Sequence, residues 1–129
     1  MDLGYVKACL KEIEDRGQLT QKVIESHNLK RSELKEESRT EKYVREFNEI
    51  QDFVDIQMGS WVIIGQIGEF LSKNPTRLPL SFTIEDHKKQ IERSRLTREF
   101  NVVSEKIHKK LLDLATAQDQ ITLRYERGE

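Results

Sequence analysis

The sequence predicts an all-α protein, because apolar residues recur at helical spacing over two long segments and few helix-breaking residues interrupt them. From Phe100 to Tyr125 the apolar positions lie three or four residues apart, which places them on one face of a helix. A second series with this spacing runs from Tyr43 to Ile64. The chain contains only two prolines and six glycines. We therefore expect a helical hairpin or irregular helical bundle with a long C-terminal helix and coiled-coil-like packing.

The length and composition limit the class of protein. The chain has 129 residues, which is the size of one domain. Its hydrophobic fraction of 36% is low and its charged fraction of 35% is high, against about 45–50% and 25% for an average domain. This balance is typical of a helix-rich, extended or oligomeric protein, and the periodic apolar residues argue against full disorder. The net charge of −1 argues against a protein that coats nucleic acid.

Cysteine content and hydropathy bear on the compartment. Cys9 is the only cysteine, so no intrachain disulfide can form, and we expect it to be a small core residue. The N-terminal sequence lacks the pattern of a signal peptide. The most apolar run, residues 58–71, contains Gln66 and Glu69 and is too short to cross a bilayer. We expect a cytoplasmic protein with no membrane span.

The N-terminal segment, residues 1–39, is expected to be helical, and Asp2 can cap its first helix. Gly17 predicts an end to this helix, with a second helix that Thr20 caps. Alternatively, one helix continues through Gly17, because Ile24 stays in phase with Val6 and a glycine inside a helix costs only about 1 kcal/mol. Residues 25–42 are strongly charged and form either a solvated helix or a connection.

The central helix is expected over residues 40–72, after a capping box formed by Ser38 and Glu41. Beyond Met58 the apolar residues point all round the helix, so we expect burial on most sides. The alternative is a short buried strand over residues 61–64, which are β-branched and bounded by glycine. Helix is favoured because the flanking pattern is helical.

A loop with two prolines is expected over residues 73–82, followed by a helix over 83–127. Thr83 can cap this helix, with Asp86 three residues further on near its positive end. Its roughly 44 residues would span about 66 Å.

No motif for catalysis, a cofactor or a metal emerges from the sequence. Glu105 and His108 have the spacing found in di-iron helical bundles, but both lie off the apolar stripe, so we expect them to be surface residues. The three histidines are scattered, which gives no support to zinc. Residues 65–68 are too short and too apolar for a phosphate loop.

Charge is distributed unevenly along the two long helices. Residues 87–110 contain eight basic and three acidic side chains, a local charge of +5, whereas 41–55 has a local charge of −3. The two segments could pair in antiparallel fashion, within or between chains. However, the core face of the last helix becomes basic before Leu96, so we expect its first turns to project from the core. The predicted partner-binding residues are Lys88, Lys89, Arg93, Arg95 and Arg98.

These observations favour a non-enzymatic protein that acts through helical surfaces, such as a small adaptor, assembly factor or inhibitor. It would bind a protein partner, would need no cofactor, and would form a homo-oligomer, most simply a dimer, to cover its long stripes. The alternative is an accessory protein that binds nucleic acid through residues 87–110. The residues predicted to form the core or the oligomer interface are Phe47, Ile50, Val54, Trp61, Phe100, Val103, Ile107, Leu111, Leu114 and Ile121.

Overall fold

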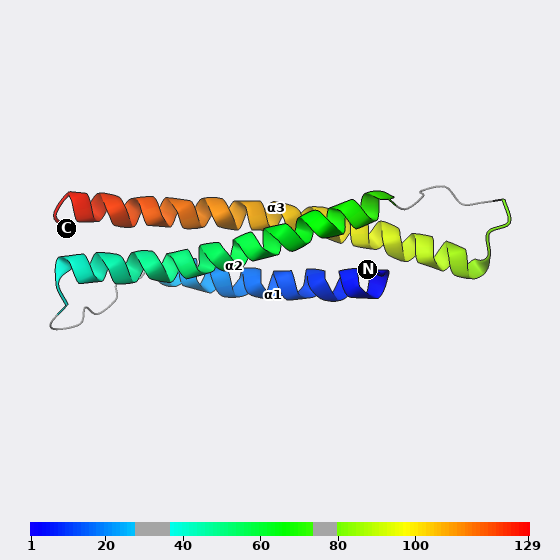
Figure 1. Cartoon of the computed structure of the whole chain (residues 1–129), viewed down its shortest axis with the longest axis horizontal. Coiled ribbons are helices and arrows are strands. Elements are labelled where there is room, and N and C mark those ends of the chain that lie inside the picture. Colours follow the sequence, from blue (N-terminus) through cyan, green and yellow to red (C-terminus); the bar gives the residue numbers. More distant parts are fainter. Residues whose placement is uncertain (28–36, 74–79) are drawn as a thin grey trace.

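The computed structural model describes residues 1–27, 37–73 and 80–129, and in these ranges it contains three helices and no strand. The helices are α1 (Leu3–His27), α2 (Arg39–Lys73) and α3 (Ile84–Glu126) (Figure 1). The prediction of an all-α chain is therefore confirmed. Most of the predicted loop at 73–82 and half of the charged stretch at 25–42 lie outside the described residues.

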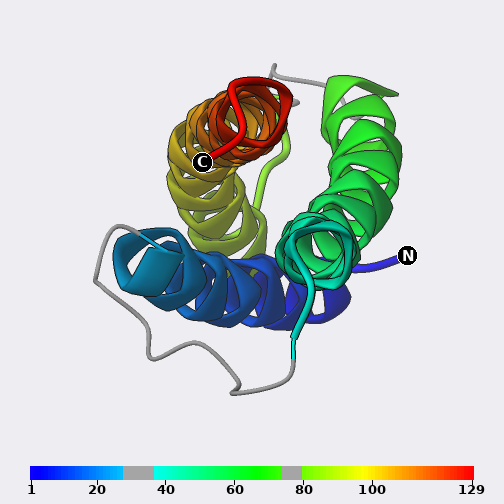
Figure 2. The ribbon, with the colours of Figure 1, turned by 90° about the vertical axis from the view of Figure 1, so that its left-hand side faces the viewer.

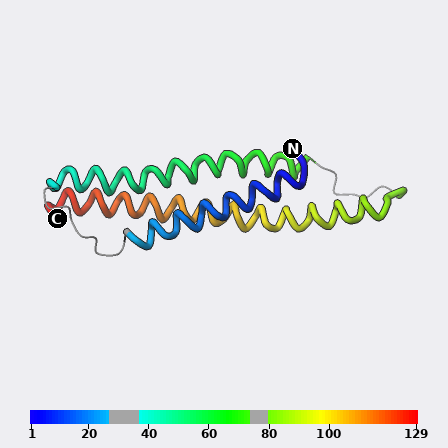
Figure 3. The backbone as a smooth tube through the Cα atoms, turned by 90° about the horizontal axis from the view of Figure 1, so that it is seen from below, coloured from blue at the N-terminus to red at the C-terminus, as the bar shows by residue number. Residues whose placement is uncertain are grey.

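The three helices form an elongated bundle in which α2 and α3 run antiparallel and α1 packs along one side of the pair (Figures 1 and 3). Seen end-on, the helices occupy three corners of a triangle (Figure 2). The α2–α3 interface is the most extensive and the α1–α2 interface the least. None of the described helices combines the length and apolar character needed to cross a bilayer.

Helix α1 begins as expected but does not break at Gly17. The Asp2 carboxylate accepts a hydrogen bond of 2.8 Å from the backbone N–H of Tyr5. The helix continues to His27, so the continuous alternative is confirmed and a second start capped by Thr20 is wrong. Thr20 is fully buried, and its hydroxyl donates to the carbonyl of Arg16 at 2.9 Å. Burial along the whole face of α1 outweighs the small cost of the glycine.

Helix α2 starts after Ser38, whose hydroxyl accepts from the backbone N–H of Glu41 at 3.1 Å. It is unbroken to Lys73, so a strand over 61–64 is wrong. Residues at helical spacing in this stretch, including Ile64 and Ile67, are buried against the other helices. Within the single chain this stretch is not buried on most sides: Val62 is 59% exposed, because α1 and α3 leave one side of α2 uncovered.

Helix α3 has the predicted N-terminal cap. The Thr83 hydroxyl accepts from the backbone N–H of Asp86 at 3.2 Å, and the Asp86 carboxylate accepts from the backbone N–H of Thr83 at 2.9 Å. Hydrogen bonding by Thr83, chiefly from its backbone N–H, holds the pKa of Asp86 below its ordinary value, because it favours the charged carboxylate. The helix ends at Glu126, and Gly128 follows with a positive φ of 82°.

The core consists of two clusters along the bundle. In the first, Val6, Leu10 and Ile13 of α1 pack against buried residues of α2 and α3, and Cys9 lies at its edge. The second is smaller and is centred on Ile50, Leu114, Ala117 and Ile121. In both clusters, α1 supplies apolar side chains that cover part of the α2–α3 pair.

The ten residues predicted as core or interface differ in their burial within the single chain. Trp61 is 40% exposed, whereas the adjacent Ser60 is fully buried. Instead, Trp61 lies beside His108 at the outer edge of α2 and α3, with ring centroids 6.2 Å apart. The buried members are Ile50, Val103, Ile107, Leu114 and Ile121, and the partly buried members are Phe47, Val54, Phe100 and Leu111.

Candidate protein-interaction surface

The register of α2 against α3 decides which charged segments meet. It is defined by four pairs along the interface: Tyr43 with Tyr125, Gln51 with Gln118, Trp61 with His108, and Gly68 with Phe100. The acidic stretch 41–55 therefore lies beside the last turns of α3 and not beside the basic stretch 87–110. Pairing of these two segments within one chain is wrong, because the apolar phases of the two helices set a different register.

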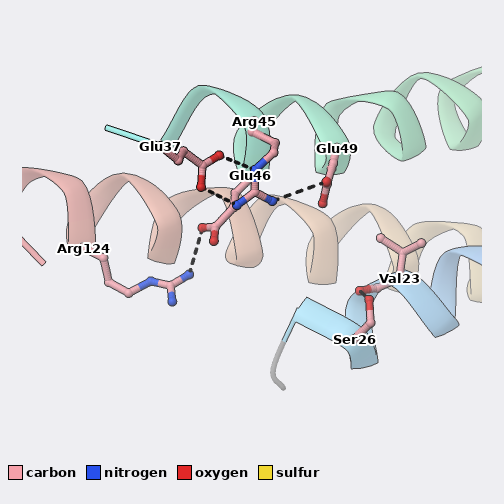
Figure 4. Close-up of polar contacts among 7 residues, drawn as sticks. All are labelled: Val23, Ser26, Glu37, Arg45, Glu46, Glu49 and Arg124. Carbon is pink, nitrogen blue, oxygen red and sulfur yellow. Dashed lines mark hydrogen bonds and ion pairs between the residues drawn. The ribbon is translucent and has the colours of Figure 1, made fainter. Parts of the chain in front are cut away.

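The acidic stretch instead forms a local ion-pair network at one end of the bundle (Figure 4). Arg45 lies 2.5 Å from Glu37 and 3.7 Å from Glu49, and Arg124 lies 3.9 Å from Glu46. The hydrogen bonds from Arg45 hold the pKa of Glu37 below its ordinary value. The acidic side chains Glu46 and Glu49 thus have partners in their own part of the fold.

The middle of the basic stretch contacts α1. Lys106 forms an ion pair of 3.3 Å with Glu14, and the Lys110 ammonium donates a hydrogen bond to the side-chain oxygen of Gln21. Part of the positive charge of α3 is therefore offset by polar groups of α1, which the sequence reasoning had not paired with it.

The first turns of α3 extend beyond the ends of α1 and α2 (Figures 1 and 3). Leu96 is the first buried residue of the helix, as the loss of apolar phase before it indicated. Four of the five predicted partner-binding residues are exposed on α3: Lys88, Lys89, Arg95 and Arg98. These cations are accessible to a partner.

Arg93 is the exception among the predicted partner-binding residues. It is partly buried, and its guanidinium donates a hydrogen bond to the backbone carbonyl of Leu71. Carbonyls in the last turn of a helix have no partner within the helix, so Arg93 satisfies one at the end of α2. Arg93 therefore contacts α2 within the chain, and its role in partner binding stays a prediction.

The exposed side of α3 combines its cations with apolar residues. Ile84 is 77% exposed, Ile91 47% and Val102 49%. These residues and the cations between them recur every three or four positions, which places them on one face. We call this face the mixed stripe; its eight exposed members, none of them acidic, are Ile84, Lys88, Ile91, Arg95, Arg98, Val102, Lys106 and Lys109.

The sequence reasoning missed the mixed stripe, although its spacing is readable. Ile84 and Ile91 lie off the core face of the helix, and the face they share continues through Arg95, Arg98 and Val102. The signal was the regular spacing of large exposed residues without an intervening carboxylate. From Ile84 to Lys109 the stripe spans 26 residues, or about 39 Å of helix.

The residues considered as metal ligands lie elsewhere. Glu105 and His108 are both exposed, as expected of surface residues. Among the described residues, no group of three or more His, Cys, Asp or Glu side chains is placed to hold a metal ion. Comparison of the chain with family models, curated proteins and solved structures gave no match.

Proposed function

We propose that this protein is a non-enzymatic adaptor or regulator that binds an acidic protein partner through the mixed stripe of α3. The observation that carries the proposal is the run of eight exposed apolar and basic positions without an acidic residue. Exposed charges of this kind contribute little to folding stability, typically less than about 1 kcal/mol each. They contribute much more to the encounter rate and register of a complementary partner.

The mixture of side chains favours a protein over a polyanion as the partner. Ile84, Ile91 and Val102 offer apolar area that a phosphate backbone cannot use, whereas Lys88 and Arg95 can pair with carboxylates. Binding of nucleic acid through residues 87–110 remains the alternative proposal, and the basic side chains are its support.

The experiment is capture from the native cell with the full chain and two variants. In the stripe variant, Lys88, Arg95 and Arg98 are replaced by Glu; in the control, Lys22, Lys73 and Arg127 are replaced by Glu. A partner retained by the unmodified chain and the control, but lost from the stripe variant, is the expected result. Equal retention by all three proteins contradicts the proposal.

The same variants separate the nucleic-acid alternative. Binding of labelled DNA and RNA is measured at two salt concentrations, because phosphate contacts release counterions and give a steep salt dependence. If the stripe variant loses a steep dependence that the control keeps, nucleic acid becomes the preferred partner.

We further propose that the chain self-associates through the side of the α2–α3 pair opposite α1, with coiled-coil-like packing of these helices. Support comes from exposed apolar side chains there: Met58, Trp61 and Val62 of α2 are 48%, 40% and 59% exposed, and Leu112 of α3 is 58% exposed. Light scattering should give a dimer, and changing Trp61 and Leu112 to Lys should give a folded monomer. A monomer at micromolar concentration for the unmodified chain contradicts this part.

A further inference from the structure

The side of the bundle between α1 and α3 is hollowed along its length. Two cavities, of about 770 and 370 Å³, lie between these helices, and both are lined by Glu14 and Val103. Along α1 they extend from Gly4 to Gln21. These 18 residues of helix correspond to about 27 Å. Because the two cavities share Glu14 and Val103, they form one groove, here called the α1–α3 groove.

The floor of the α1–α3 groove is apolar. Leu10 and Ile13 of α1 and Val103 and Ile107 of α3 line it while belonging to the buried core, and Val102 is half exposed at its edge. An apolar floor about five helical turns long is the surface against which an amphipathic helix buries its apolar face.

The walls of the groove are mainly basic. Six cations and two carboxylates, those of Glu14 and Glu99, line the two cavities. Lys106 pairs with Glu14. Among the described residues, the other cations form no ion pair: Lys7 and Lys11 on α1, and Arg98, Lys109 and Lys110 on α3. Because cations lie on both sides of the groove, a complementary bound segment would carry carboxylates on both sides of its apolar face.

Small residues on the α1 side of the groove leave room for a neighbouring helix. Gly4 and Ala8 line the larger cavity, and Gly17 lines the smaller one. A Cβ atom added at Gly17 would meet nothing within 4 Å. A neighbouring backbone can therefore approach α1 closely, within the 8–10 Å typical of packed helices.

We propose that the α1–α3 groove binds an acidic amphipathic helix of about five turns from the partner protein, which becomes the fourth helix of the bundle. Its apolar face covers the floor, and its carboxylates lie between Lys7 and Lys11 on one side and Arg98 and Lys109 on the other. This inference rests on the proposed function, since it states where the acidic partner binds and which kind of segment the partner presents. Among the described residues that line the groove there is no aromatic side chain to stack on bases, and Glu14 and Glu99 would repel phosphates.

The test selects helices on the immobilised full chain. The probe is a display library of 20-residue amphipathic helices. Leu residues stand alternately three and four positions apart, so that they form one apolar face, and the positions on both sides of this face are randomised between Glu and Lys. Glu-flanked helices should be enriched. Their affinity should fall at least tenfold for Gly17→Leu and for Ala8→Trp, which fill the groove, and should be unchanged for Gly59→Leu, where an added Cβ also meets nothing within 4 Å. Melting temperatures of the three variants show that each is folded.

Two results would overturn the inference. One is a selection without preference for Glu over Lys. The other is a set of Glu-flanked helices that bind both groove-filling variants as tightly as the unmodified chain. The acidic partner would then bind elsewhere on α3, and the proposed function would still hold. Failure of the proposed function is seen separately, as retention of the native partner by the stripe variant. Binding of a labelled 20-nucleotide DNA or RNA that both groove-filling variants abolish would assign the groove to nucleic acid instead.

Discussion

The Gln57 side chain of α2 donates a hydrogen bond of 2.8 Å to the Thr20 hydroxyl of α1, and both residues are fully buried. The hydroxyl in turn donates to the carbonyl of Arg16. The remaining amide oxygen of Gln57 is buried without a hydrogen-bond partner in the described structure. A buried pair of this kind fixes the position of α1 along α2 at some cost in stability, because an unpaired buried acceptor is unfavourable.

Replacing both members of this pair should therefore be tolerated better than replacing one. Thr20→Val alone leaves the Gln57 amide unpaired and should lower the free energy of unfolding by about 1–3 kcal/mol. The double change Thr20→Val with Gln57→Leu should recover this loss and equal or exceed the unmodified chain. Urea unfolding of the two single variants and the double variant measures the coupling. Additive single effects would contradict a direct bond.

Two glycines of α2 should respond in opposite ways to alanine. A Cβ at Gly68 would lie 2.9 Å from the ring tip of Phe100, whereas one at Gly65 would meet nothing within 4 Å. Gly65→Ala should raise the free energy of unfolding by about 1 kcal/mol through helix propensity. Gly68→Ala should give no such gain, because the Phe100 ring has to shift. In a Phe100→Leu background the two alanine substitutions should become equivalent; a persistent difference measured by thermal unfolding would mean that the ring is not the cause.

Arg93 and Arg95 are two residues apart but should behave differently. Arg93 satisfies the carbonyl of Leu71, whereas Arg95 is exposed and lies 3.5 Å from Glu92 on its own helix. Arg93→Ala should speed amide exchange in the last turn of α2 and lower the melting temperature, since a hydrogen bond from a charged group contributes about 1.5–3 kcal/mol. Arg95→Ala should do neither. Hydrogen exchange followed by mass spectrometry compares them, and equal protection of residues 67–73 would rule out the assigned role of Arg93.

The capping box of Thr83 and Asp86 should stabilise only the first turn of α3, and this stabilisation should depend on pH. Thr83→Ala should fray the first turn of α3 with little change in melting temperature, because this turn projects from the core. The pKa of folded Asp86 is lowered below its ordinary value, so its contribution is present above that value and is lost as the pH falls through the folded pKa. NMR Cα shifts of residues 84–88, followed from pH 7 to pH 2, should show this loss of helix. In Asp86→Asn the pH dependence should disappear; if it persists, another group is responsible.

Features that depend on a residue and its own backbone were predictable from the sequence. The caps at Asp2 and Thr83 are of this kind, because each side chain bonds an N–H three residues away. The helical phase of α2 and α3 was also predictable, since burial on one face repeats every three or four residues.

Features that depend on where a second helix lies were not predictable. Trp61 fits the apolar phase of α2 but lies beside His108 at the outer edge of the α2–α3 interface, where it is 40% exposed. Arg93 interrupts the core phase of α3 because the group it meets is a carbonyl of α2, whose position follows from the register of the hairpin. The cations of the candidate site were identified from local charge, whereas the groove beside them required the position of α1.

Helix α3 is offset along the bundle relative to α1 and α2, so it fixes the distance between its projecting first turns and the opposite end of the bundle. Its 43 residues run unbroken from Ile84 to Glu126, a distance of about 65 Å. Because the first turns stand clear of the bundle and the last turns pack on α2, a partner held at Ile84 is kept at a fixed distance from Tyr125. The helix therefore holds its projecting N-terminal turns away from the end of the bundle where Tyr125 stacks on Tyr43, as well as contributing to the core.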